Sequence, residues 1–306
     1  MNCIVFGGGG FIGSHICDEL LSQDNKVRAF GRTRSNYLSR DVEWYQGDFC
    51  KASDVENALD EMEVIFHVIS TTIPQTSNES PDKDIESNVI STLRMLEIAR
   101  IKKIKKVIFI SSGGTVYGIP ENIPINEKHV TNPISSYGVH KLTIEKYLML
   151  YFYLYGLDYA ILRVSNPYGI RQPIIGSQGA IGIFINKALN REVIEIWGDG
   201  SVVRDYIYVT DVAKAASLVV NNNSSLKIFN IGSGEGKSLL QIIQYIEKQL
   251  DIKLKVNFKN ERKLDVPKNI LDINLALNIL SWKPSISFEE GINKTIDFMK
   301  VEMLQK

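Results

Sequence analysis

A glycine-rich turn near the start of the chain constrains the fold more than any other feature. The apolar run from Asn2 to Phe6 leads into Gly7, Gly10 and Gly13, and a helical pattern follows. Gly7 allows a tight turn after the strand, Gly10 lets the backbone approach a ligand, and Gly13 lets the helix pack closely on the sheet. The start of that helix presents free N–H groups and the positive end of the helix dipole. The pattern predicts a cradle for the pyrophosphate of a dinucleotide, with an ordinary glycine turn as the alternative.

Short apolar strands alternate with amphipathic helices through the first half of the chain. We expect strands at 2–6, 26–30, 42–46, 64–68, 106–111 and 158–163, and helices at 12–22, 53–60, 83–100 and 136–155. This alternation predicts an α/β fold with a doubly wound parallel sheet. Ligands of such sheets bind beyond the carboxyl ends of the strands, where the expected elements place Gly7, Asp48, Ser70, Ser111 and Ser165.

After about residue 167 the alternation of strands and helices becomes less regular. We expect strands at 194–197, 205–208, 228–231 and 253–258, and helices at 178–190, 210–220, 239–250 and 288–304. Residues 1–167, with contributions from about 205–235, are therefore expected to form a dinucleotide-binding domain. Residues 168–306 are expected to form mainly a smaller C-terminal substrate-binding lobe.

Composition excludes several classes of protein. The 306 residues include 35 basic and 35 acidic side chains, so a nucleic acid is not an expected partner. The three cysteines lack CxxC spacing, and the four histidines lack ligand spacing, so we expect neither disulfides nor a catalytic metal. No apolar run approaches the roughly 18 residues that span a bilayer. We expect an unprocessed cytoplasmic protein without a membrane partner.

A tyrosine and a lysine lie four residues apart near the start of the helix expected at 136–155. Tyr137 and Lys141 therefore project from the same helix face. A positive charge beside a phenol favours its ionised form, and an oxidised nicotinamide nearby would add to this effect. A tyrosinate accepts the proton of a sugar or alcohol hydroxyl while hydride leaves the carbon. A half-buried tyrosine beside a lysine with an extended, solvated head group is the structural alternative.

The glycine turn and the Tyr-x-x-x-Lys motif together resemble the short-chain dehydrogenase/reductase superfamily. Further motifs resemble its extended branch, which modifies nucleotide sugars, and the whole pattern, from residue 1 to about residue 295, is similar to UDP-glucose 4-epimerases. These motifs are Gly47-Asp48, Asn88-Val89, SSGGTVYG at 111–118, RVSNPYG at 163–169, GDGSVVRDYIYVTD at 198–211, NIGSG at 230–234, RKLDVP at 262–267 and Trp282-Lys283-Pro284. The resemblance implies a Rossmann sheet and a bound nicotinamide cofactor.

The resemblance also implies roles for individual residues. Asp48 would bind the adenine amino group, Ser111 and Ser112 would lie under the nicotinamide ribose, and Lys141 would hold the ribose hydroxyls and lower the pKa of Tyr137, the acid/base. The implied cofactor contacts are Gly7, Gly10, Phe11, Ile12, Gly13, Arg32, Asp48, Phe49, Ser70, Ser111, Ser112, Tyr137 and Lys141. Asn166 would contact the sugar or diphosphate, and Arg204 and Arg262 would clamp the diphosphate, which suits the forked guanidinium group.

Three departures from the pattern bear on the chemistry. Gly113 replaces the catalytic Ser/Thr of the family, so we expect Thr115 to supply the missing hydroxyl at the catalytic and substrate site, with Ser112 as the second choice. Gly31-Arg32 follows the second strand where NAD-preferring relatives carry an acid, so NADP is an alternative to the NAD that we expect. Asn269 replaces a bulky aromatic residue, which predicts a pocket for N-acetylhexosamines as well as hexoses.

The expected function is 4-epimerisation of a UDP-hexose or UDP-N-acetylhexosamine through a transient 4-keto sugar. The alternatives are an NADPH-dependent reductase of a 4-keto nucleotide sugar and a non-catalytic cofactor-sensing protein of the same fold. No acidic residue lies at 113–115, which argues against a dehydratase. The resemblance implies that the helices at 83–100 and 136–155 pair across the interface of a homodimer. We expect such a homodimer, because the second helix carries more apolar side chains than one sheet face needs: Leu142, Tyr147, Leu148, Tyr151, Phe152 and Tyr155.

Overall fold

Seven parallel strands form the main sheet in the computed structural model, which describes residues 1–72, 74–174, 179–260 and 266–304. The order across the sheet is β10-β6-β5-β4-β1-β2-β3. Parallel pairing joins every neighbouring pair. The strands are β1 (Asn2–Phe6), β2 (Lys26–Gly31), β3 (Glu43–Gln46), β4 (Val64–His67), β5 (Lys106–Ser112), β6 (Asp158–Val164) and β10 (Ile228–Ile231).

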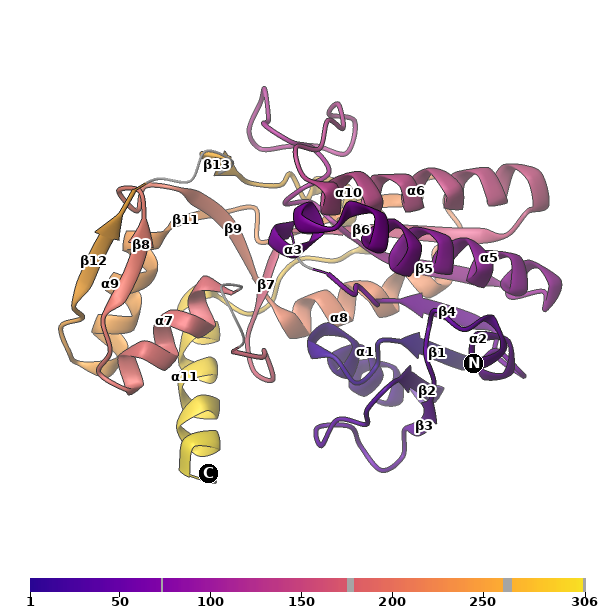
Figure 1. Ribbon diagram of the computed structural model, residues 1–306, viewed down its shortest axis with the longest axis horizontal. Helices are drawn as coiled ribbons and strands as arrows, with labels where there is room; N and C mark the ends of the chain where they lie inside the picture. Colours follow the sequence, from indigo (N-terminus) through magenta and orange to yellow (C-terminus); the bar gives the residue numbers. More distant parts are fainter. Residues whose placement is uncertain (73, 175–178, 261–265, 305–306) are drawn as a thin grey trace.

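Helices cover both faces of this sheet (Figure 1). On one face α1 (Phe11–Leu21), α8 (Val209–Leu218) and α10 (Asn274–Leu280) bury apolar side chains of the strands. On the other face α2 (Ala52–Ala58), α5 (Ser91–Ile101) and α6 (Ser136–Tyr155) do the same. The predicted doubly wound parallel fold is confirmed. The strand order reverses between β1 and β4, and ligands of such sheets bind beyond the carboxyl ends of the strands at this point.

The helix predicted at 83–100 has a π-helical turn within it. The segment runs through α4 (Pro81–Asp84), the π-helix η1 (Ile85–Ile90) and then α5. The Asn88 side chain donates to the Asp84 carbonyl at 3.2 Å, within this wider turn. Such turns interrupt helices frequently at functional sites. A helical sequence pattern alone does not distinguish a π turn from an α turn.

A smaller group of elements lies beside the main sheet, at the left of Figure 1. Strand β9 (Val203–Tyr208) pairs with β7 (Asn166–Tyr168), β11 (Gly236–Ser238) and β13 (Lys268–Asn269). Strands β8 (Ile194–Trp197) and β12 (Val256–Lys259) form a separate pair. An apolar core joins β7, β8, β9 and β12 to three helices, α7 (Ala180–Leu189), α9 (Leu239–Leu250) and α11 (Phe288–Leu304).

Several elements differ from the sequence expectations. The predicted strand at 253–258 begins later, as β12. Of the helix predicted at 178–190, residue 178 lies outside the described residues. The helix predicted at 210–220 is α8, which ends at Leu218 and continues as the 3-10 turn η2 (Val219–Asn221). The pattern also missed five short elements: α3 (Pro74–Glu79), β7, β11, β13 and α10. All five are short, so they contain too few residues to display a periodic pattern of apolar side chains.

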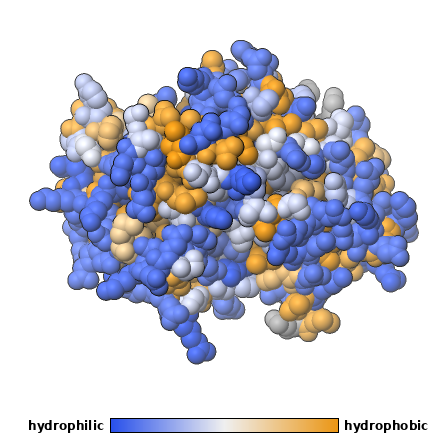
Figure 2. All heavy atoms as spheres, turned by 180° about the vertical axis from the view of Figure 1, so that it is seen from behind, coloured by the Kyte–Doolittle hydropathy of each residue, from blue (hydrophilic) through white to orange (hydrophobic). Residues whose placement is uncertain are grey.

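Most of the face shown in Figure 2 is hydrophilic, and hydrophobic atoms gather in its upper half. Within the described ranges, the structure contains no helix that is both long and apolar enough to cross a membrane.

Candidate active site

The glycine turn lies at the carboxyl end of β1 as predicted. Gly7 has φ +87°, and its amide donates to the Phe30 carbonyl at 3.0 Å. Helix α1 begins at Phe11 with Gly10 as N-cap, and no side chain caps it. A Cβ atom on Gly13 would lie 2.1 Å from the Gly7 carbonyl oxygen. The turn therefore depends on glycine for its own packing, and it leaves the N–H groups of the first helical turn without a side-chain acceptor.

Asp48 and Arg32 lie at the ends of the neighbouring strands β3 and β2. Asp48 Oδ1 accepts from the Cys50 amide at 3.0 Å, and the Asp48 amide donates to Asp54 at 2.9 Å. Phe49 is buried between the rings of Phe6 and His67. Arg32 is exposed. This edge of the sheet thus offers a fixed carboxylate and an exposed guanidinium group, and the contacts predicted for both stay predictions.

Ser111 has a buried partner within the protein. Its hydroxyl donates to Glu145 at 2.5 Å, and Arg163 holds the same carboxylate with Nη2 at 2.7 Å. Arg163 also donates to the Tyr117 hydroxyl at 3.0 Å. Sequence reasoning did not identify this network, because its members come from β5, β6, α6 and the loop after β5. It fixes α6 against the sheet, and the predicted ribose contact of Ser111 stays a prediction.

Tyr137 and Lys141 lie in the first turns of α6, beyond the end of β5. The helix begins with Ser135 as N-cap, whose hydroxyl accepts from the Gly138 amide at 3.2 Å. Lys141 Nζ donates to the Ile110 carbonyl at 2.9 Å and lies 5.6 Å from the centre of the Tyr137 ring. The predicted shared orientation of the phenol and the ammonium is therefore present in the fold.

Burial changes the acid–base properties of both groups. Burial lowers the pKa of Lys141 to about 8, although the carboxylates of Glu145 and Asp84 oppose this shift. Burial raises the pKa of Tyr137 to about 12. Loss of solvent dominates the net shift of the Tyr137 pKa, and the predicted lowering of this pKa by Lys141 stays a prediction. A neutral phenol is the resting form of Tyr137 at neutral pH.

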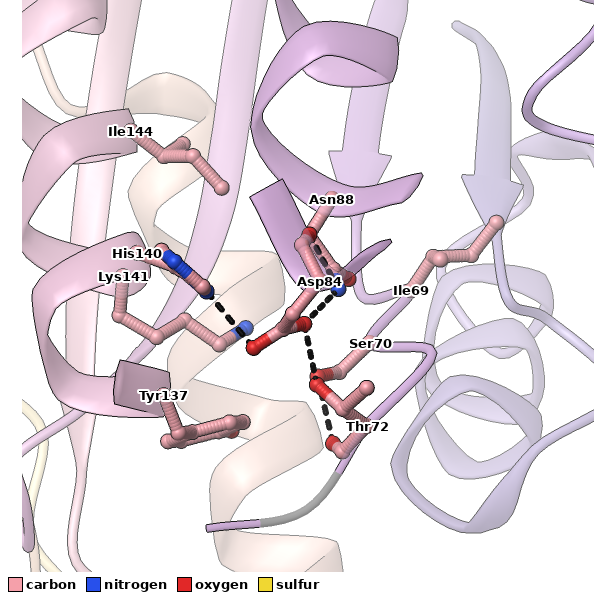
Figure 3. Close-up of a pocket in the computed structure, with 9 residues that line it drawn as sticks. All are labelled: Ile69, Ser70, Thr72, Asp84, Asn88, Tyr137, His140, Lys141 and Ile144. Carbon is pink, nitrogen blue, oxygen red and sulfur yellow. Dashed lines mark hydrogen bonds and ion pairs between the residues drawn. The ribbon is translucent and has the colours of Figure 1, made fainter. Parts of the chain in front are cut away.

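A buried carboxylate lies beside this pair and was missed by sequence reasoning. Asp84 lines a small pocket together with Tyr137 and Lys141 (Figure 3). His140 Nδ1 lies 2.7 Å from Asp84 Oδ2. The remaining lining residues are Ile69, Ser70, Thr72, Asn88 and Ile144. In the sequence, the only sign of this His140–Asp84 pair was that His140 directly precedes Lys141. Asp84 lies 56 residues away, so the sequence did not reveal it as the partner.

The end of β5 and the loop after it carry the two residues expected to replace the missing catalytic hydroxyl. Thr115 Oγ1 is buried and has no hydrogen-bond partner among the described residues. Ser112 is half-buried at the end of β5. An unpartnered buried hydroxyl is costly, so a ligand that pairs with Thr115 would recover this cost. This observation supports Thr115 as the first choice.

Gly113 is closely packed, which predicts the effect of restoring a serine there. A Cβ atom on Gly113 would lie 2.6 Å from Leu271 Cδ1 and 2.9 Å from the Arg163 carbonyl oxygen. We expect Gly113→Ser to destabilise the fold by about 1–3 kcal/mol through overpacking. Gly114→Ser is the matched control, because a Cβ atom there has no neighbour closer than 3.8 Å. Thermal unfolding measures both variants, and equal melting temperatures would contradict this account of position 113.

The predicted substrate residues come from three segments that meet near Gly113. Asn166 Nδ2 donates to the Asp205 carbonyl at 3.0 Å. Arg204 Nη1 donates to the Val266 carbonyl at 2.5 Å. The Arg204 backbone in β9 pairs in register with that of Asn269 in β13. Asn269 Nδ2 donates to the Gly113 carbonyl at 3.2 Å, while its buried Oδ1 has no partner in the described part of the chain. Arg262 lies outside the described residues.

Comparison with known proteins gives consistent matches. Residues 3–232 match the model of the NAD dependent epimerase/dehydratase family. A UDP-glucose 4-epimerase of Mycolicibacterium smegmatis is 33% identical over 98% of this chain and 99% of its own length. A dTDP-4-dehydro-6-deoxyglucose reductase of Escherichia coli is also 33% identical, over 96% of each chain.

Solved structures match over the same length. The UDP-glucose 4-epimerase of Thermotoga maritima, solved with UDP-glucose, has a TM-score of 0.95 at 34% identity and covers 99% of this chain and 100% of its own. The UDP-N-acetylglucosamine 4-epimerase of Methanobrevibacter ruminantium has a TM-score of 0.92 at 32% identity and covers 99% of each chain.

Proposed function

Because the chain belongs to the NAD dependent epimerase/dehydratase family, we propose that it is a nucleotide-sugar 4-epimerase. One observation carries the proposal: Tyr137 and Lys141 share the small pocket beyond the end of the parallel sheet, in the fold that also holds the glycine turn. The substrate is a UDP-hexose or a UDP-N-acetylhexosamine. Residues 1–167, with 205–235, serve the cofactor, and residues 168–306 mainly serve the substrate.

The glycine turn fits a dinucleotide. The uncapped start of α1 offers amide donors to a pyrophosphate, and a Cβ atom on Gly10 would meet one protein atom, the Gly7 carbonyl oxygen at 3.2 Å, so that the space beyond Gly10 is open. Gly7, Gly10 and Gly13 would hold the pyrophosphate, and Asp48 the adenine. Lys141 has three N–H donors and uses one on Ile110, which leaves two for ribose hydroxyls. When bound, the oxidised nicotinamide supplies a hydride acceptor and a positive charge.

We propose NAD as the cofactor, in line with the family description. The exposed Arg32 favours the alternative, NADP, because a guanidinium group attracts a 2′-phosphate. Isothermal titration with both dinucleotides tests the choice. Tighter binding of NAD supports the proposal, and clear preference for NADP would overturn it.

Tyr137 accepts the proton of the sugar 4-hydroxyl and later returns it. A positive charge at the nicotinamide position lowers the pKa of the buried phenol, since it stabilises the phenolate. Lys141 keeps its ammonium beside the phenol, and Thr115 orients the reacting hydroxyl with its unpartnered Oγ1. The sugar passes through a 4-keto form, turns about its diphosphate and is reduced on its other face.

Incubation with UDP-galactose and UDP-N-acetylgalactosamine, without any added reductant, tests the function. Inversion at C4 is the expected result. A requirement for reductant would favour a reductase of a 4-keto nucleotide sugar, which the Escherichia coli relative and Arg32 support as the second candidate. Inactivity on a panel of nucleotide sugars, with the dinucleotide still bound, would favour a non-catalytic sensor.

The size of the sugar pocket depends on Asn269. Its buried Oδ1 is free to accept from a substrate hydroxyl or amide N–H, and the side chain is small. We expect Asn269→Tyr to lower kcat/KM for the N-acetylated substrate about tenfold relative to the hexose. The exposed neighbour Lys268 offers a matched control, Lys268→Tyr. The same substrate ratio in both variants would contradict a role for Asn269 in selection.

We propose that the protein is a homodimer that pairs through α6. Of the apolar residues predicted for this interface, Leu142, Tyr147, Leu148 and Tyr151 instead pack within the chain. Val139 is exposed near the start of α6, and the other exposed apolar side chains lie toward its end: Met149, Leu150, Phe152, Tyr153, Leu154 and Tyr155. An exposed apolar patch of this kind is typical of an interface.

A charged substitution on this surface tests the dimer. We expect wild type to have twice the 34.5 kDa chain mass in light scattering and Leu154→Asp to be a monomer, because a buried unpaired charge is unfavourable. Phe258→Asp, on exposed β12, is the matched control and should stay dimeric. A monomeric wild type would overturn the proposal.

A further inference from the structure

Asp84 is almost fully buried and collects hydrogen bonds from four segments of the chain. Its carboxylate accepts from Thr72 at 2.5 Å, from Asn88 at 2.5 Å and from His140 (Figure 3). It also accepts from the Ser77 hydroxyl. Burial raises the pKa of Asp84, but the hydrogen bonds from Ser77, Thr72 and His140 outweigh burial and the net shift is downward. The carboxylate is therefore ionised at neutral pH, and His140 Nδ1 must carry the proton of their hydrogen bond, since a carboxylate only accepts.

These bonds join the loop after β4 to the helix that carries the acid/base pair. Thr72 belongs to that loop and His140 to α6. Within the loop, the Ser70 hydroxyl donates to the Thr72 carbonyl at 3.0 Å. Asp84 thereby fixes Ser70 in the same pocket as Tyr137.

The charge of Asp84 also acts directly on both members of the pair. It raises the pKa of Tyr137 and opposes the fall in the pKa of Lys141. The other titratable groups around the pair are His140 and Glu145 on α6 and His67 on β4. Burial lowers the pKa of His67 to about 3, so its ring is neutral. Asp84 and Glu145 are therefore the negative charges that face Lys141 among the described residues.

We infer that Asp84, held by His140, is a positioning residue for proton transfer at Tyr137: its charge keeps Lys141 protonated and its hydrogen bonds hold the pocket wall. The inference rests on the proposed function. A purely structural clamp is the competing account, and the two differ in what they predict for the pH dependence of activity.

The sign of the pH effect follows from the chemistry. Activity requires Tyr137 ionised and Lys141 protonated. Loss of the Asp84 charge makes the Tyr137 phenol easier to ionise and makes the Lys141 ammonium lose its proton at lower pH. In a plot of kcat/KM against pH, the rising limb and the falling limb therefore both move to lower pH. A structural defect lowers activity at every pH and leaves the limbs in place.

Asp84→Asn removes the charge and keeps the shape of the side chain. We expect both limbs to move down by about one pH unit, with NAD affinity within about threefold of wild type. Ser77→Ala is the charge-keeping control, because it removes one donor to the same carboxylate. Its limbs should stay at the wild-type positions. Unmoved limbs in Asp84→Asn, or equal movement in Ser77→Ala, would overturn the inference.

A second variant allows the test if Asp84→Asn does not fold, and a second measurement allows it without enzymatic turnover. Asp84→Ser also removes the charge and leaves room for water, and it replaces Asp84→Asn if that variant does not fold. Phenolate absorbance, taken as the difference from the same protein with Tyr137→Phe, follows Tyr137 without substrate. It should appear at lower pH in the Asp84 variants. An inactive wild type would refute the proposed function alone, whereas an unshifted phenolate signal would refute this inference.

Discussion

Tyr137→Phe is expected to lower kcat for 4-epimerisation by about 10²–10⁴-fold, because it removes the group that carries the hydroxyl proton. The ring remains, so the packing around Lys141 and the pocket should persist. Dinucleotide affinity should stay within about threefold of wild type, since the phenol makes none of the proposed pyrophosphate contacts. Initial rates with a saturating UDP-sugar, together with a binding titration, measure both quantities.

Tyr153→Phe is the matched control for this result. Tyr153 lies on the same helix and is 85% exposed, so loss of its hydroxyl should leave kcat unchanged. If Tyr137→Phe retained wild-type turnover, proton transfer would have to occur elsewhere. If it lost the cofactor as well, the role of Tyr137 would be structural.

Gly13→Ala is expected to have the second large effect. The new Cβ atom would lie 2.1 Å from the Gly7 carbonyl oxygen, which is backbone and cannot move without displacing β1 or α1. We expect a loss of about 3 kcal/mol or more of folding stability, together with loss of dinucleotide binding. Chemical denaturation and isothermal titration measure the two effects.

Gly10→Ala separates the cofactor contact from the packing of the turn. Its Cβ atom would lie 3.2 Å from the Gly7 carbonyl oxygen, so the folded protein should lose only about 1 kcal/mol. The same methyl group would lie where we propose the pyrophosphate to bind. Because of this steric clash, affinity for the dinucleotide should fall tenfold or more. Unchanged affinity in Gly10→Ala would place the pyrophosphate elsewhere.

Local sequence patterns predicted the elements of the main sheet well. Strand β1, the glycine turn and α1 follow one another within 21 residues, so their signals are all local. The same is true of α6, which was predicted at 136–155 with Tyr137 and Lys141 on one face; the structure adds Ser135 and Gly156 as its caps. Hydrophobic periodicity and turn chemistry suffice for such segments.

The missed features depend on contacts between distant segments. Strand β13 has only two residues and exists because β9 pairs with it. Asp84 and His140 are 56 residues apart, and no local pattern connects them. The burial that raises the Tyr137 pKa was not visible in the sequence for the same reason, because it arises from the assembled fold and not from the helix alone.

Retention of an isotope at C4 tests the central claim most directly. UDP-galactose that carries deuterium at C4 is incubated with the NAD-loaded protein in ordinary water, without reductant, and the product is analysed by NMR and mass spectrometry. The account predicts UDP-glucose with deuterium still at C4, because the hydride stays in the site while Tyr137 handles only the hydroxyl proton. Product without deuterium at C4, or no product until a reductant is added, would contradict it.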